Sequence, residues 1–140
     1  MIKCRTIGML DHAVTNPVIK LDKDIANNSF VTVDGDLYLI MNTITGDDAY
    51  VDDVVIKAGN LLNGYLMKAF VSQEIVADDK HIAYAEGKGF DDIKAGTTLF
   101  TVDANGKLAV AASAPASGIY FKCTGKTALT GNAVILKVMA

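Results

Sequence analysis

The sequence is poor in the residues that most often carry catalysis or covalent cross-links. Its 140 residues include two histidines, two cysteines, two prolines and no tryptophan. His12 and His81 lie far apart in the chain, and no pattern around them signals Ser-His-Asp or Cys-His catalysis. We therefore expect no catalytic residues and no enzymatic activity.

The positions of the two cysteines argue against a disulfide. Cys4 and Cys123 lie at opposite ends of the chain, so they could pair only if the N-terminal residues returned to the C-terminal sheet. Two thiols in a chain without an export signal are more often buried and reduced. A chain of this length buries roughly two thirds of its unfolded surface on folding, so it needs neither a disulfide nor a metal ion for stability.

An excess of positive charge and a long apolar run are both absent. Lysine and arginine total 13 against 16 acidic residues, which gives a net charge of −3. Without a basic face to neutralise a phosphate backbone, nucleic acid is not an expected partner. No stretch approaches the ~20 apolar residues of a membrane span, and no signal-peptide run follows the N-terminus. We expect synthesis in the cytoplasm and no membrane partner.

What the sequence does contain is a strong β-strand pattern, clearest near its C-terminal end. Two β-favouring runs, residues 97–102 and 107–110, flank a turn that ends in Asn105 and Gly106. Both of these residues tolerate a positive φ better than most. The pattern predicts a β-hairpin.

A second hairpin is expected between residues 29–33 and 36–41, because Asp34 and Gly35 suit a two-residue type I′ turn. Its second strand is apolar at nearly every position. Such a strand is typically buried on both faces, either inside a closed sheet or against another molecule.

Shorter apolar runs complete the expected strands, and the last two alternate cleanly between faces. About eight short strands with Gly, Asn and Asp turns predict a mainly β fold, a small antiparallel sandwich or barrel-like domain. Residues 72–80 are the best candidate for a helix, and we expect at most one short helix. The further strands are predicted at residues 54–57, 64–71, 81–85, 119–123 and 133–138, with residues 61–69 as an alternative short helix.

Residues 1–24 contain scattered apolar residues without a regular period. They predict an extended N-terminal arm, followed by a single β-rich domain over residues 25–140. Such an arm can pack along its own domain or reach onto a neighbouring subunit.

Three motifs suggest ligand chemistry, and each fails on inspection. Gly125, Lys126 and Thr127 match the end of a phosphate-binding loop, but Tyr120 stands where such a loop needs glycine, so a turn lysine is favoured. The acidic loop 47–53 lacks the regular ligand spacing of a calcium-binding loop. Adjacent aspartates at 78–79 and 91–92 point apart in an extended chain and make poor acid–base pairs. We expect no metal site, no cofactor and no small-molecule substrate.

Several blocks of the sequence resemble the small accessory head proteins of tailed bacteriophages. The blocks are residues 24–35, 52–58, 95–102 with 106–108, and 133–138. The resemblance implies a β-rich capsid decoration protein that binds the outer surface of the major capsid protein lattice and reinforces it. As a hypothesis, the arm supplies the capsid or subunit contact through its apolar residues Ile2, Ile7, Met9 and Leu10.

Two other functions stay open. The same kind of β domain occurs in small tail or baseplate subunits, and a small ligand-binding β-barrel is also compatible with the strand pattern. A ligand-binding barrel should keep inward polar groups among its apolar ones, and no such set is visible in the strands. The chain alone could be a monomer or a trimer, since either suits a capsid lattice.

Overall fold

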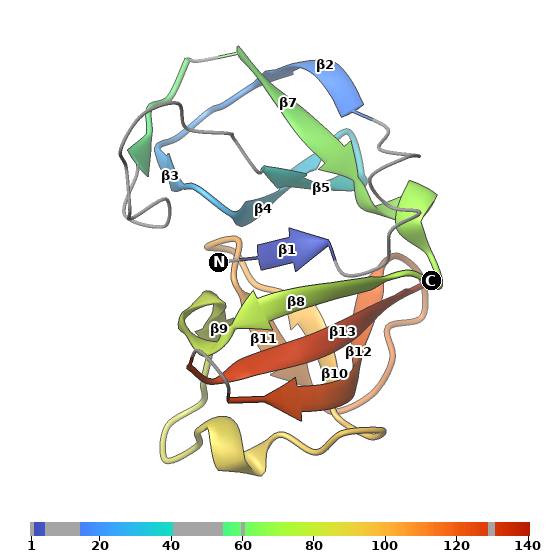
Figure 1. Cartoon of the computed structure of the whole chain (residues 1–140). Coiled ribbons are helices and arrows are strands. Elements are labelled where there is room, and N and C mark those ends of the chain that lie inside the picture. The colour runs from blue at the N-terminus through green and yellow to red at the C-terminus, as the bar shows by residue number, and fades with distance from the viewer. Residues whose placement is uncertain (1, 5–14, 41–54, 60, 129–130) are drawn as a thin grey trace.

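The computed structural model describes residues 2–4, 15–40, 55–59, 61–128 and 131–140 (Figure 1). Within these residues the protein is mainly β, which confirms the expected fold class. The helical segments of this part are three short 3-10 turns, rather than at most one short helix. They are η2 (Met67–Phe70), η3 (Asp79–His81) and η4 (Phe90–Asp92).

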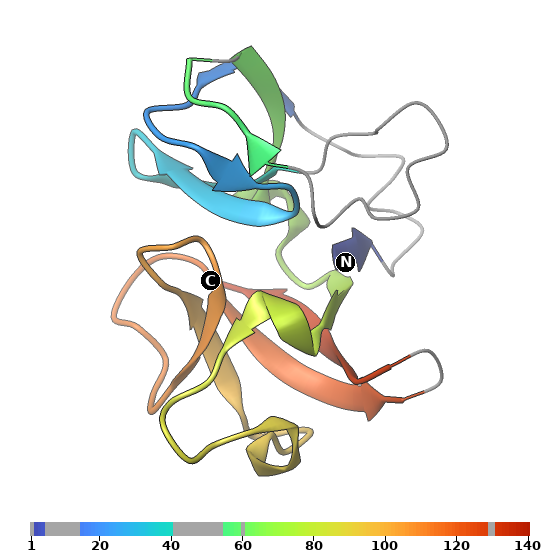
Figure 2. The same ribbon diagram turned by 90° about the vertical axis from the view of Figure 1, so that its left-hand side faces the viewer.

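A seven-stranded sheet holds most of the C-terminal half of the chain, and it curls like part of a barrel (Figures 1 and 2). Adjacent strands within this sheet pair antiparallel, except that β9 runs parallel to β11. From one edge to the other, the strands are β1 (Ile2–Cys4), β8 (Glu74–Asp78), β13 (Ala133–Met139), β12 (Tyr120–Thr127), β10 (Leu99–Val102), β11 (Leu108–Ala111) and β9 (Ile82–Ala83).

A four-stranded antiparallel sheet lies over the curled one in Figure 1, and a two-stranded pair accompanies it. The sheet has the order β2 (Thr15–Lys20), β7 (Leu61–Leu66), β5 (Asp36–Ile40) and β4 (Ser29–Val33). The pair consists of β3 (Ile25–Ala26) and β6 (Val55–Ile56).

The first described residues belong to these sheets. β1 is the edge strand beside β8, and β2 is an edge strand of the four-stranded sheet. The described parts of residues 1–24 therefore pack within the chain's own fold, which is one of the two arrangements left open for the arm. The boundary expected after Asp24 stays a prediction.

The helix expected over residues 72–80 was a wrong prediction, because this segment contains strand β8. Ile75 and Ala77 are fully buried, while Glu74, Val76 and Asp78 on the other face are partly exposed. This alternation has the period of a strand. β8 also has strand neighbours on both sides, β1 and β13, so tertiary pairing decides its conformation.

The strand expected over residues 64–71 begins earlier and ends earlier than predicted. β7 ends at Leu66, and the chain then forms η2, whose Met67 and Phe70 are both fully buried. Residues three apart lie on one face of a 3-10 turn. Met67 and Phe70 therefore both reach the core. In a strand, two residues three apart would point to opposite faces of the sheet.

The two predicted hairpins are confirmed. In the first, Asp34 has φ 50° and Gly35 has φ 83°, and both positive values fit the expected type I′ turn between β4 and β5. In the second, β10 and β11 pair in register, and Gly106 in their turn has φ 79°.

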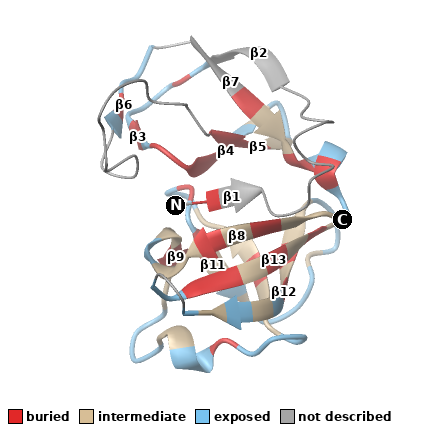
Figure 3. Cartoon of the chain, in the orientation of Figure 1, coloured by how far each residue is buried: buried red, intermediate tan, exposed pale blue. Residues whose placement is uncertain are grey.

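Strand β5 is buried on both faces, as its apolar sequence predicted (Figure 3). Leu39 joins the main core beneath the four-stranded sheet, whereas Tyr38 and Ile40 join a second cluster with Leu21, Ile25 and Ile56. Adjacent side chains of a strand point to opposite faces. β5 therefore belongs to two apolar clusters at once.

The two sheets meet where β4 touches the turn between β10 and β11. The Phe30 N–H donates to the Gly106 carbonyl at 3.0 Å, and the Phe30 ring lies 5.3 Å from that of Phe121 between centroids. An aromatic pair at this distance stabilises its contact beyond the area it buries. The main core therefore contains residues of both sheets.

The backbone register separates the two cysteines. Across the sheet Cys4 pairs with Ile75, Ile75 with Leu136, and Leu136 with Cys123. Strands lie about 4.8 Å apart, so the two cysteine Cα atoms are roughly 14 Å apart, beyond the reach of a disulfide. Cys123 is a buried free thiol, and burial raises its pKa. The chain does return its N-terminal residues to the C-terminal sheet, but not next to Cys123.

The contact between β4 and the turn that joins β10 to β11, here called the junction, can be tested by comparing two glycines with positive φ. A Cβ at Gly106 would lie 2.5 Å from the Phe30 carbonyl oxygen, whereas a Cβ at Gly35 meets nothing within 4 Å. Left-handed backbone costs an alanine roughly 1–2 kcal/mol, and overpacking adds roughly 1–3 kcal/mol. We expect Gly35→Ala to lower the free energy of unfolding by about 1 kcal/mol and Gly106→Ala by about 3 kcal/mol in urea denaturation. Equal losses for the two variants would contradict the close contact at the junction.

Candidate functional site

Of the four residues proposed from the sequence to contact a capsid, the structure describes Ile2 alone. Ile2 is 1% exposed and packs in the main core, so its side chain is not available to a partner in this structure. Ile7, Met9 and Leu10 lie outside the described residues, as do His12 and the acidic loop 47–53.

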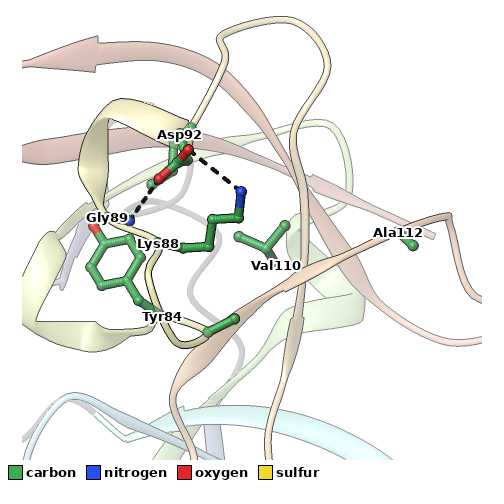
Figure 4. A pocket seen from close by; sticks show the side chains of 8 residues that line it. Tyr84, Lys88, Gly89, Asp92, Val110 and Ala112 are labelled. Atoms are coloured by element: carbon green, nitrogen blue, oxygen red, sulfur yellow. Dashed lines mark hydrogen bonds and ion pairs between the residues drawn. The ribbon is translucent and has the colours of Figure 1, made fainter.

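A surface hollow, here called the rim pocket, lies at the end of the curled sheet (Figure 4). Its volume is about 400 Å³. It forms because β9 ends at Ala83 while β11 continues to Ala111, and the chain after β9 leaves the sheet edge. Its lining residues are Tyr84, Ala85, Lys88, Gly89, Asp92, Ile93, Val110 and Ala112.

The walls of the rim pocket are mainly apolar and join the main core. Ile93 is 1% exposed and belongs to that core, and the ring of Tyr84 packs against it. Val110 is 55% exposed, unusually high for a large aliphatic side chain on the strand opposite buried Phe100. Such exposed apolar surface beside a concavity is a common property of binding sites.

The polar groups of the rim pocket differ in how fully they are engaged. Asp92 accepts a hydrogen bond from the Gly89 N–H at 2.8 Å. The Lys88 ammonium lies 3.9 Å from the same carboxylate, too far for a hydrogen bond. The Tyr84 hydroxyl is buried without a hydrogen-bond partner in the described part of the chain. Burial, followed by the charge of Asp79, raises the pKa of Tyr84, so the phenol is neutral.

Lys126 fixes the wall that carries Ile93. Its ammonium donates to the Phe90 carbonyl at 2.9 Å and to the Ile93 carbonyl at 3.1 Å, and it lies 4.2 Å from the centroid of the Phe90 ring. Lys126 belongs to strand β12 rather than to the predicted turn. The lysine of the Gly-Lys-Thr motif is thus occupied by the chain's own carbonyls at the end of η4.

A second hollow of about 440 Å³ lies beside the edge strand β4. Val31, Val33 and Lys23 are among its lining residues, and the Lys23 ammonium donates to the Ala104 carbonyl at 3.0 Å. This hydrogen bond links the bend between β2 and β3 to the turn between β10 and β11. The remaining lining residues are Lys20, Leu21, Asp22 and Ile25.

Several acidic residues of the described chain accept hydrogen bonds from their neighbours in the fold. No three histidine, cysteine, aspartate or glutamate side chains in the described part of the chain gather closely enough to hold a metal ion. Asp24 accepts the Ala58 N–H at 2.8 Å and the Lys57 ammonium at 3.1 Å. These two bonds, the backbone one first, lower the pKa of Asp24 below its ordinary value of 3.8.

Comparisons with known proteins add no identification. The chain matches no family model, and neither the curated proteins nor the solved structures contain a match to it. Among the described residues there is no helix of the length and apolar character that crossing a bilayer requires.

The role of Lys126 can be tested by replacing it with methionine. Lys126→Met keeps the length of the side chain but removes both hydrogen bonds and the cation over Phe90. Because Lys126 is an exposed residue, we expect a loss of about 1 kcal/mol in the free energy of unfolding. We also expect faster amide exchange over residues 88–96. Lys107→Met is the matched control, because Lys107 is exposed too; similar exchange in both variants would contradict the role of Lys126.

The lowered pKa of Asp24 should make the stability of the fold depend on pH. Because its pKa is lower in the folded than in the unfolded state, its contribution is present above the unfolded value and is lost as the pH falls through the folded value. The stability advantage of the wild-type chain over Asp24→Asn should therefore shrink as the pH falls below about 4. Urea denaturation of both proteins from pH 7 to pH 2.5 measures it, and a constant difference would count against this assignment.

Proposed function

We propose that the chain is a structural virion protein, a decoration protein that binds the outer surface of a tailed-phage capsid and stabilises its lattice. Its partner is the major capsid protein, and it is made in the host cytoplasm before it joins the virion. It acts through surface contact and needs neither a catalytic group nor a cofactor.

The observation that carries this proposal is the position of the blocks that resemble phage accessory head proteins. Their described parts contain β4 with its turn, β6, β10 with the start of β11, and β13. The similarity in spacing therefore falls on strands, including the first strand of each hairpin and β13, the last strand in sequence.

Physical features of the protein suit a surface role. The edge strand β2 contains Pro17, and its pairing with β7 shifts register between Asn16 and Ile19. Proline and a bulge both discourage unwanted pairing at a sheet edge. The net charge of −3 disfavours contact with packaged DNA, which supports a position on the outside of the shell.

The proposal predicts saturable binding to empty capsids. The probe is empty heads assembled from the major capsid protein encoded in the same genome as this chain. In analytical ultracentrifugation, we expect the free chain to sediment as a monomer or trimer and to cosediment with the heads up to a fixed ratio. Purified tails from the same phage serve as the control particle. Binding to tails but not to heads would contradict decoration and favour a tail or baseplate subunit.

A further inference from the structure

The turn between β10 and β11 contains an asparagine followed by a glycine. Asn105 is exposed, and its side-chain amide makes no hydrogen bond within the described part of the chain. Gly106 has no side chain to shield its backbone nitrogen. In such a pair the glycine nitrogen can attack the asparagine amide, which is one reason why asparagine is among the heat-labile residues. The turn therefore has the composition of a deamidation site.

The reaction needs only the chain itself and water. The Gly106 nitrogen bonds to Cγ of Asn105, the bond from Cγ to Nδ2 breaks, and the Gly106 amide proton leaves with the ammonia. Water then adds to one carbonyl carbon of the resulting five-membered imide and breaks its bond to nitrogen, which regains a proton. Opening at Cγ gives an aspartate. Opening at the main-chain carbonyl gives an isoaspartate, in which the main chain runs through Cγ.

The sequence contains one other Asn-Gly pair, Asn63 and Gly64. This pair lies in strand β7, which has strand neighbours on both sides, β2 and β5, and Gly64 is buried. A turn at the surface opens at a lower free energy than a strand paired within a sheet. Asn105 is therefore the more reactive of the two asparagines in the folded protein.

Asp103 closes the turn around Asn105. Its carbonyl accepts the Gly106 N–H at 3.1 Å, and its carboxylate accepts the N–H groups of Asn105 at 2.8 Å and Lys107 at 2.9 Å. The Gly106 nitrogen must leave the Asp103 carbonyl before it can attack. Local opening of this turn therefore limits the rate of the reaction.

We propose that Asn105 is a site of spontaneous deamidation, and that its conversion to isoaspartate loosens the junction. Isoaspartate adds one methylene group to the main chain immediately before Gly106. There the Phe30 N–H donates to the Gly106 carbonyl at 3.0 Å, and the Phe30 carbonyl oxygen lies 2.5 Å from the position of a Gly106 Cβ. A longer turn cannot keep both this contact and its own hydrogen bonds to Asp103. This inference is independent of the proposed function.

The first test measures where the folded protein loses ammonia during incubation at mildly alkaline pH. Mass spectrometry of tryptic digests follows Asn105 in peptide 95–107 and Asn63 in peptide 58–68. We expect conversion at Asn105 to be at least about tenfold faster, because the turn opens more readily than the sheet. Equal rates, or faster conversion at Asn63, would overturn Asn105 as the modification site.

Asn105→Gln is the matched control for this measurement. Glutamine keeps the amide but would have to form a six-membered ring, which closes far more slowly. Asn105 is not among the residues with a positive φ, so the turn accepts the longer side chain. We expect the variant to lose the fast conversion in peptide 95–107 and to keep the wild-type rate in peptide 58–68. Fast loss of ammonia from peptide 95–107 in this variant would overturn the assignment.

The second test asks whether the added methylene loosens the junction. The isoaspartate form is separated from the incubated protein by ion exchange and compared with Asn105→Asp, which adds the charge without lengthening the chain. We expect exchange of the Phe30 amide hydrogen to be at least about tenfold faster in the isoaspartate form than in fresh protein. In Asn105→Asp it should stay within about twofold, because exposed substitutions change stability little. Unchanged exchange in the isoaspartate form, or equally fast exchange in both, would overturn the effect on the junction.

Discussion

The structure depends on the contact between β4 and the turn that joins β10 to β11. There the Phe30 N–H binds the Gly106 carbonyl, and the rings of Phe30 and Phe121 pack together. A glycine is required because the backbone has a positive φ and the Phe30 carbonyl lies where a side chain would begin. Both sheets contribute side chains to one core at this contact, and the Lys23 hydrogen bond to Ala104 adds a second link nearby.

The same hairpin connects the junction to the rim pocket. The turn of the β10–β11 hairpin is held against the four-stranded sheet, while the far end of β11 carries exposed Val110. A strand fixed at one end by the core presents its other end in a defined position. Preorganised surfaces bind with a smaller loss of conformational entropy than flexible ones. This arrangement is suited to a protein whose proposed role is to hold other subunits in place.

Local patterns predicted much of the fold. Both hairpins, the alternation of β12 and β13 and the double burial of β5 follow from neighbouring residues and turn chemistry alone. Local patterns did not predict strand β8, because its short apolar run is also compatible with a helical turn. Its strand conformation depends on pairing with β1 and β13. The burial of Ile2 was missed for the same reason. The rim pocket was beyond sequence reasoning, since alternation places Val110 on the same face as buried Leu108. Its exposure depends on where the neighbouring strand β9 ends.

The position of β8 has a consequence for how the chain folds. β8 lies between β1, from the beginning of the described chain, and β13, from its end. Both pairings close long loops, and the conformational entropy of loop closure must be lost before these contacts form. Proteins dominated by such distant contacts fold slowly compared with those built from local ones. On the ribosome, the curled sheet can be completed only after β13 has emerged, so the β4–β5 hairpin has time to form before the sheet that will cover it.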